Sequence, residues 1–156
     1  MSCGLALAAA LLVTDPSVAV QPAAPPPHTL AQEPLYADIV SRSQALKGVV
    51  DNWIASGAAE DAGFSGRADF AAFRGEAMTL AERDMAGHVD LRERNTDGDL
   101  RCILRGLSED LHERVDALAA ADTTNARADA LAELSYLLRD NVEVVTTPPA
   151  PSTPAQ

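Results

Sequence analysis

Apolar residues recur at helical spacing along four stretches of the chain, and small polar residues, glycine or proline separate these stretches. The first helical pattern runs from about 34 to 56, the second over 67–94 and the third over 99–121, and the fourth follows the capping residues 122–125. No stretch alternates between apolar and polar residues as a half-buried strand would. The pattern therefore predicts an all-α fold of four amphipathic helices.

Each predicted helix has an apolar stripe that we expect to face a common core. The stripe residues are Leu35, Ile39, Leu46, Val49, Val50 and Trp53 in the first helix, Phe70, Phe73, Ala77, Leu80 and Leu91 in the second, Leu100, Ile103, Leu104, Leu107, Leu111, Val115 and Leu118 in the third, and Leu131, Leu134, Leu138 and Val142 in the fourth. Short connections between such helices favour an antiparallel four-helix bundle in a single domain over residues 34–145.

The segment NTDGDLRC (95–102) resembles the start of a calcium loop, because oxygen-bearing side chains alternate around Gly98. With Gly98 at the sixth loop position, the twelfth position must supply a bidentate glutamate, but Leu104 of the third apolar stripe stands there. We therefore interpret the segment as a corner between two helices. Asp97 or Asp99 would cap the third helix, and Gly98 would supply a flexible turn.

The two ends of the chain differ from its middle. Residues 4–13 are all apolar or small, a run too short for a membrane-spanning helix but typical of a secretory signal with cleavage after Ala19. We expect residues 1–19 to be a signal peptide. Because no Lys or Arg precedes the run, the alternatives are a true start that lies upstream and an uncleaved apolar tail. Proline-rich composition predicts a disordered tether over 20–33 and a disordered tail over 146–156.

The charge of the chain excludes some partners. Its 23 acidic and 12 basic residues give a net charge of -11, which argues against binding to nucleic acid or to an anionic membrane surface. Removal of the signal would leave no membrane span and would place the protein in the periplasm or the medium. Cys102 would then be the one remaining cysteine, without an internal disulfide partner.

The sequence contains no motif for a cofactor or for catalysis that we recognise. It lacks the Cys-x-x-Cys-His run for covalent haem attachment and the paired Glu-x-x-His motifs of di-iron bundles. Acidic neighbours disfavour the thiolate of Cys102, so we expect an inert thiol. We therefore predict no cofactor, no metal and no enzymatic activity.

Four ionisable residues fall on or beside the predicted inner faces. Asp84 and His88 lie one turn apart on the second helix, and Asp38 and Arg42 lie one turn apart on the first. If these helices are antiparallel neighbours, Arg42 comes level with Asp84, and Asp38 with His88. Because a lone buried charge is costly, we predict that Asp38, Arg42, Asp84 and His88 form a buried polar cluster.

This cluster admits three interpretations. It could be a structural network that fixes helix register, or it could line a cleft or face a partner. A metal or catalytic site is the third, which Arg42 disfavours because its charge repels a cation. The sequence thus predicts an exported, acidic, non-catalytic helical bundle that binds a protein partner or a small ligand, in an oligomeric state that it does not specify. The alternative is a metal- or cofactor-binding bundle that uses the polar cluster on the first two helices.

Overall fold

The computed structural model describes residues 29–147, which form four long α-helices joined by short connections. The elements are η1 (Thr29–Gln32), α1 (Pro34–Ala55), η2 (Ala58–Glu60), η3 (Phe64–Gly66), α2 (Ala68–Glu93), α3 (Gly98–Ala120) and α4 (Thr124–Thr146), where η marks a 3-10 turn. The predicted all-α fold of four helices is confirmed, and each observed helix end lies within a residue or two of its predicted position. The predicted signal peptide, most of the tether and nearly all of the tail lie outside the described residues.

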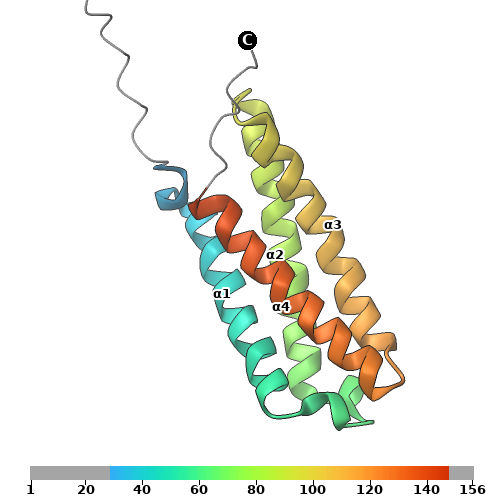
Figure 1. Ribbon diagram of the computed structural model, residues 1–156. Coiled ribbons are helices and arrows are strands. Elements are labelled where there is room, and N and C mark those ends of the chain that lie inside the picture. Colours follow the sequence, from blue (N-terminus) through green and yellow to red (C-terminus); the bar gives the residue numbers. More distant parts are fainter. Residues whose placement is uncertain (1–28, 148–156) are drawn as a thin grey trace, which may run out of the picture.

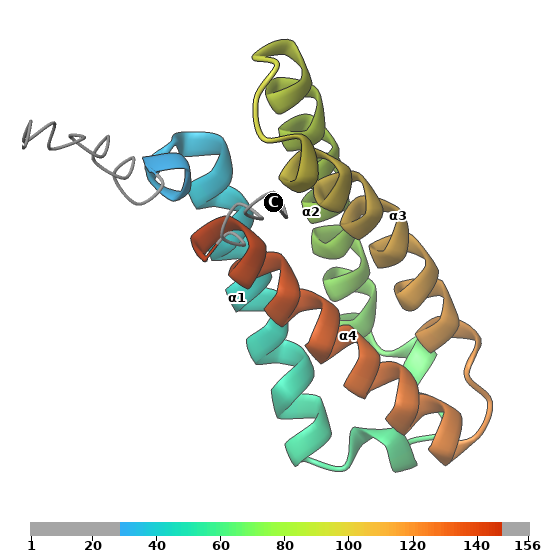
Figure 2. The same ribbon diagram turned by 45° about the horizontal axis from the view of Figure 1, so that its top comes forward.

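The four helices form a bundle in which each helix packs mainly against two others. The most extensive contacts join α2 to α3 and α1 to α4, and narrower seams join α1 to α2 and α3 to α4. Figures 1 and 2 show that the chain reverses direction at each connection and that the α2–α3 connection projects beyond the ends of α1 and α4. Helices α2 and α4 therefore lie diagonally across the bundle from each other.

Local sequence determines where the helices begin. Pro34 is the first residue of α1, where its missing N–H would have no intrahelical partner in any case. A carboxylate oxygen of Asp97 accepts from the Leu100 N–H at 3.3 Å and caps α3, as predicted. The expected flexibility of Gly98 is not used, because Asn95 and Asp97 adopt the left-handed backbone conformation, and Gly98 is already helical.

The end of the predicted tether is ordered against the bundle. Residues of η1 form a 3-10 turn that buries Leu30 in the core, where an extended, disordered segment was expected. The next residue, Glu33, accepts two hydrogen bonds from the Arg94 guanidinium, at 3.0 and 2.5 Å. This bidentate pair lowers the pKa of Glu33 and joins the start of α1 to the end of α2.

The predicted stripes supply most of the core. Nearly all of their leucine, isoleucine and phenylalanine side chains are buried, and α4 stays helical to its end because Val145 is fully buried. Val49 is the clear exception, since 38% of its surface is exposed at the seam between α1 and α2.

One end of the bundle is closed by the aromatic side chains. Trp53, Phe64, Phe70 and Phe73 pack together, with the Trp53 ring centroid 5.1 Å from that of Phe64 and 5.0 Å from that of Phe73. These residues include the only tryptophan and all three phenylalanines of the chain. Edge-to-face contacts of this kind stabilise a cluster beyond its buried area.

Three helices come together around Gly87, toward the other end of the bundle. A Cβ atom at this position would lie 2.9 Å from Leu104 Cδ1 and 3.4 Å from Tyr36 Cε1. Tyr36 is itself fully buried, and its hydroxyl donates to Asp90 Oδ2 at 2.8 Å. The absence of a side chain at Gly87 therefore allows α1, α2 and α3 to pack together here.

We predict that two glycine-to-alanine substitutions in α2 have opposite effects. Gly87→Ala should lower the free energy of unfolding by about 1–3 kcal/mol, because Leu104 is buried and must shift. A Cβ atom at Gly75 would have no neighbouring atom within 4 Å. Gly75→Ala should therefore raise the free energy of unfolding by about 0.5–1 kcal/mol, because alanine has the higher helix propensity. Urea unfolding of both variants tests this pair, and equal effects would contradict the packing at Gly87.

Candidate functional site

Two of the four ionisable residues of the predicted cluster lie at the surface of the seam between α1 and α2. Arg42 is 3.0 Å from Asp38 Oδ2 and 2.9 Å from Glu76 Oε2, and Arg83 also reaches Asp38, at 3.2 Å. The side chains of Asp38 and Arg42 are each about one third exposed, at 36% and 31%. These residues form a solvent-screened ion-pair network, not a buried one.

The predicted pairs of Arg42 with Asp84 and of Asp38 with His88 are therefore wrong. A helical projection gives the direction of the Cα–Cβ bond only, whereas the long Arg42 side chain carries its guanidinium out to water along the edge of the helix. His88 turns toward α3, where its Nδ1 lies 2.8 Å from the carbonyl oxygen of Arg101. Of the four residues, only Asp84 is fully buried.

Asp84 is held in the core by a residue that the sequence reasoning missed. The side-chain amide of Asn141 in α4 donates to Asp84 Oδ2 at 2.7 Å, and both side chains have no exposed surface. Asn141 lies seven residues after Leu134 and three after Leu138, within the apolar stripe of α4. A polar residue within an apolar stripe is the pattern that pointed to Asp84, and the same pattern could have identified Asn141 from the sequence.

The Asp84–Asn141 contact, which we call the core pair, crosses the bundle. It joins α2 to α4, two helices that otherwise make few contacts because α1 and α3 lie between them. One oxygen of each side chain, Asp84 Oδ1 and Asn141 Oδ1, has no hydrogen-bond partner among residues 29–147. Burial raises the pKa of Asp84 to about 7, although the hydrogen bond from Asn141 acts in the opposite direction.

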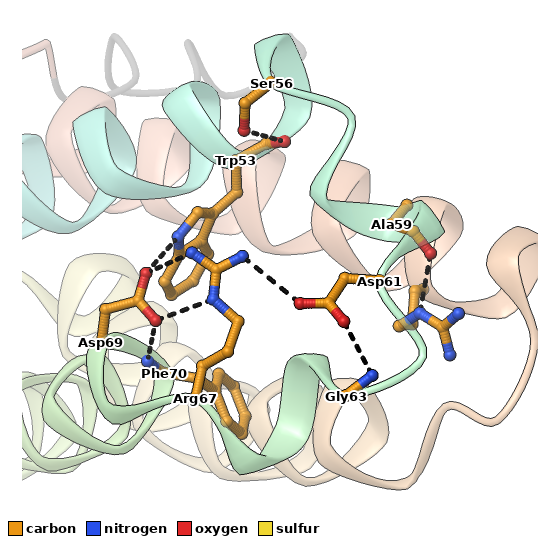
Figure 3. Close-up of polar contacts among 9 residues, drawn as sticks. Trp53, Ser56, Ala59, Asp61, Gly63, Arg67, Asp69 and Phe70 are labelled. Carbon is orange, nitrogen blue, oxygen red and sulfur yellow. Dashed lines mark hydrogen bonds and ion pairs between the residues drawn. The ribbon is translucent and has the colours of Figure 1, made fainter.

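A second polar network fastens the connection between α1 and α2 at the aromatic end. Figure 3 shows Arg67 between Asp61 and Asp69, with the indole of Trp53 directed at Asp69. Arg67 Nη2 is 2.6 Å from Asp69 Oδ2, and the indole N–H donates to the same oxygen at 3.1 Å. These hydrogen bonds, first that of Arg67, lower the pKa of Asp69 to about 2.

Arg127 fastens the same end of the bundle from α4. Its side chain is buried and donates to the backbone carbonyl of Ala59 at 2.7 Å and to that of Ala121 at 3.2 Å. A buried arginine is here satisfied by carbonyl oxygens that have no helical partner. The polar side chains at this end, those of Arg67, Asp69 and Arg127, thus have partners within the protein and need no ligand to account for them.

Each of the two seams has a groove on its outer side. The α1/α2 groove has a volume of about 440 Å³ and is lined by Arg42, Ala45, Leu46, Val49, Asp69, Ala72, Phe73 and Glu76. The α3/α4 groove has a volume of about 520 Å³ and is lined by Leu107, Asp110, Arg114, Ala132, Glu133, Tyr136, Leu137 and Asp140. Both volumes are in the range that accepts a small ligand or a few side chains of a partner.

The rims of the two grooves differ in charge. The α1/α2 groove is crossed at its edge by the Arg42–Glu76 ion pair, so its charges are partly neutralised. The lining of the α3/α4 groove has three carboxylates and one guanidinium; Arg114 is paired with Glu133 at 2.5 Å, and Arg139 is paired with Asp140 at 3.4 Å. Tyr136 beside it is 58% exposed, the highest value among the large apolar side chains of the described residues.

Other candidate chemistry gathers in neither groove. Between residues 29 and 147, no three potential metal ligands of the His, Cys, Asp or Glu type come together. Cys102 is exposed and is not part of a disulfide in this range. None of the four helices has an apolar stretch long enough to cross a membrane, a statement that covers the described part of the chain.

Comparisons with known proteins add no family. No model of a protein family matches the chain, and searches of curated proteins and of solved structures found no match.

We predict that Asn141 matters more to stability than Arg42. Asn141→Ala removes the donor to a buried carboxyl group and should lower the free energy of unfolding by about 2–3 kcal/mol at neutral pH. Arg42→Ala breaks ion pairs that water screens and should cause a much smaller loss. Urea unfolding of both variants decides the matter; a larger loss for Arg42→Ala would restore the pairing expected from the sequence.

Proposed function

We propose that this protein is an exported, non-catalytic binding protein whose α3/α4 groove holds a basic, amphipathic segment of a partner protein. The single observation that carries the proposal is the combination of an apolar floor, an exposed tyrosine and an acidic rim in one groove. Apolar anchors on the partner would fill the floor, and lysine or arginine side chains would meet the rim.

The floor of the groove suits apolar anchor residues. Leu107 and Leu137 are nearly buried and form its base, while Tyr136 stands exposed at its edge with the Arg139 guanidinium 4.4 Å from the ring centroid. A tyrosine in such a position offers a large contact area and a polar tip, and this is why tyrosine is enriched where proteins bind one another.

The negative charge around the groove favours a positively charged partner. Residues 107–143 include nine acidic and three basic side chains, so they carry more than half of the net charge of -11. One of the three basic residues, Arg127, is buried and bonded to backbone carbonyls. The field over α3 and α4 thus favours a cationic partner and accelerates its approach.

Export is supported by the sequence alone. The apolar run of residues 4–13 and the small residues before Ala19 fit a secretory signal, and the mature protein would then act in the periplasm or the medium. A strongly acidic, lysine-poor surface is compatible with a freely diffusing binding protein.

A labelled peptide tests the proposed groove. The probe is a synthetic helix-forming peptide with leucines on one face and lysines on the other, and the measurement is fluorescence anisotropy with the full chain at two salt concentrations. We expect saturable binding that weakens with salt and that falls about tenfold in Tyr136→Ala and about tenfold in the double variant Asp110→Asn/Asp140→Asn.

Two matched controls separate the groove from general attraction. Glu82→Gln/Glu93→Gln removes the same charge from exposed positions of α2, and Val49→Ala trims the other groove. Both should bind the peptide nearly as the parent protein does. Equal losses in all variants, or equal binding of a peptide with glutamates in place of lysines, would overturn the proposal.

A further inference from the structure

We infer that the core pair is a proton-linked latch: in the closed bundle Asp84 carries a proton on Oδ1 and donates it to Asn141 Oδ1. The inference is independent of the proposed function. It concerns the one carboxyl group of the described residues that lies fully inside the bundle.

The hydrogen-bond chemistry of the two side chains requires an additional donor. The Asn141 amide already donates to Asp84 Oδ2, and each side chain retains one oxygen without a partner within residues 29–147. When Asp84 is ionised, its Oδ1 and the Oδ1 of Asn141 are both acceptors, so they cannot form a hydrogen bond with each other. One proton converts Asp84 Oδ1 into a donor, and the neutral acid and the amide then have complementary edges.

The surroundings offer no cation that could replace the proton. On α1, Tyr36 donates to Asp90, and Asp38 is occupied by Arg42 and Arg83. Other titratable groups of α2, α3 and α4 are also engaged elsewhere: His88 with the Arg101 carbonyl, Arg105 with Glu109, His112 with the Ser108 carbonyl, and Asp140 with Arg139. An ionised Asp84 would therefore be a buried charge with a single amide donor.

The position of the pair determines what its proton controls. Helices α2 and α3 form one closely packed pair and α1 and α4 the other, and the core pair joins these two helix pairs through the core. Both grooves lie on the seams between these two pairs. Loss of the proton therefore weakens the closed bundle at the seams on which the grooves are built.

The direction of the pH dependence follows from the raised pKa of Asp84, about 7 against an ordinary value of 3.8. The contribution of the protonated Asp84 to the free energy of unfolding is fully present below about pH 4 and is lost as the pH rises toward 7. Above pH 7 this contribution changes no further. The unfolding equilibrium should shift about tenfold per pH unit in this window, about a thousandfold in all, or roughly 4 kcal/mol.

Other carboxylates act in the opposite direction at lower pH. The pKa values of Glu33, Asp51 and Asp69 are lowered by their hydrogen bonds to Arg94, Lys47 and Arg67. Their contribution is present above about pH 4 and is lost on further acidification. The two effects occupy separate windows, so stability should have its maximum near pH 4–5.

The test is urea unfolding of the full chain between pH 4.5 and 8.5. Asp84→Asn reproduces the neutral acid with a permanent N–H donor, so its stability should be flat over this range and should exceed that of the parent protein at pH 8.5. Asp129→Asn removes a charge from an exposed position of α4 outside both grooves, and His88→Gln/His112→Gln removes the described histidines. Both controls should retain the parent slope.

Two results would overturn the latch. The first is a parent protein whose stability does not fall between pH 5 and 8, which needs no variant and so holds even where Asp84→Asn fails to fold. The second is a folded Asp84→Asn variant that keeps the parent slope, because the titrating group would then be another residue.

Discussion

The core pair is the constraint on which the arrangement of the four helices depends. Leucine side chains pack against one another in several relative positions of two helices, so an apolar core alone specifies register weakly. A buried hydrogen bond between Asp84 and Asn141 forms in one register only, because a shift of either helix would leave both polar groups without a partner. The shape of each groove depends on this register, because residues of two helices line it.

The two ends of the bundle are fastened by different chemistry. At one end, the aromatic cluster and the Arg67–Asp69 pair hold the α1–α2 connection. At the other, the Glu33–Arg94 pair and the close approach at Gly87 join α1 to α2. Asp84 lies three residues before Gly87 in α2, so the core pair is close to this second end, and a change in its protonation acts on the packing of the helix pairs there.

Periodicity predicted the fold because every helix is long enough to show its apolar stripe several times. Burial of Leu104, Leu111 and Leu134 could be predicted from spacing alone. The exposure of Val49 could not, since it depends on how far apart α1 and α2 stand at the seam. The ordered turn of η1 was missed for the same reason: Leu30 is buried only because α1 and α4 leave a place for it.

The site was predicted in part. The position of Asp84 on an inner face was correct, but its partner was assigned to the neighbouring helix by charge, and the structure supplies an uncharged partner from the diagonal helix. Spacing along one helix gives the direction of a side chain, whereas the choice of partner depends on side-chain length and on which helices face one another across the core. The same polar-in-apolar signal that pointed to Asp84 was present at Asn141 and would have completed the pair.

The most direct test of this account is the titration of Asp84 itself. Carbon-13 NMR of the full chain, labelled at aspartate carboxyl carbons and assigned with Asp84→Asn, follows its protonation from pH 3 to 9. The account predicts one carboxyl that titrates with a pKa of about 7, well above the ordinary value of 3.8. An Asp84 carboxyl that is already ionised at pH 5 would contradict it.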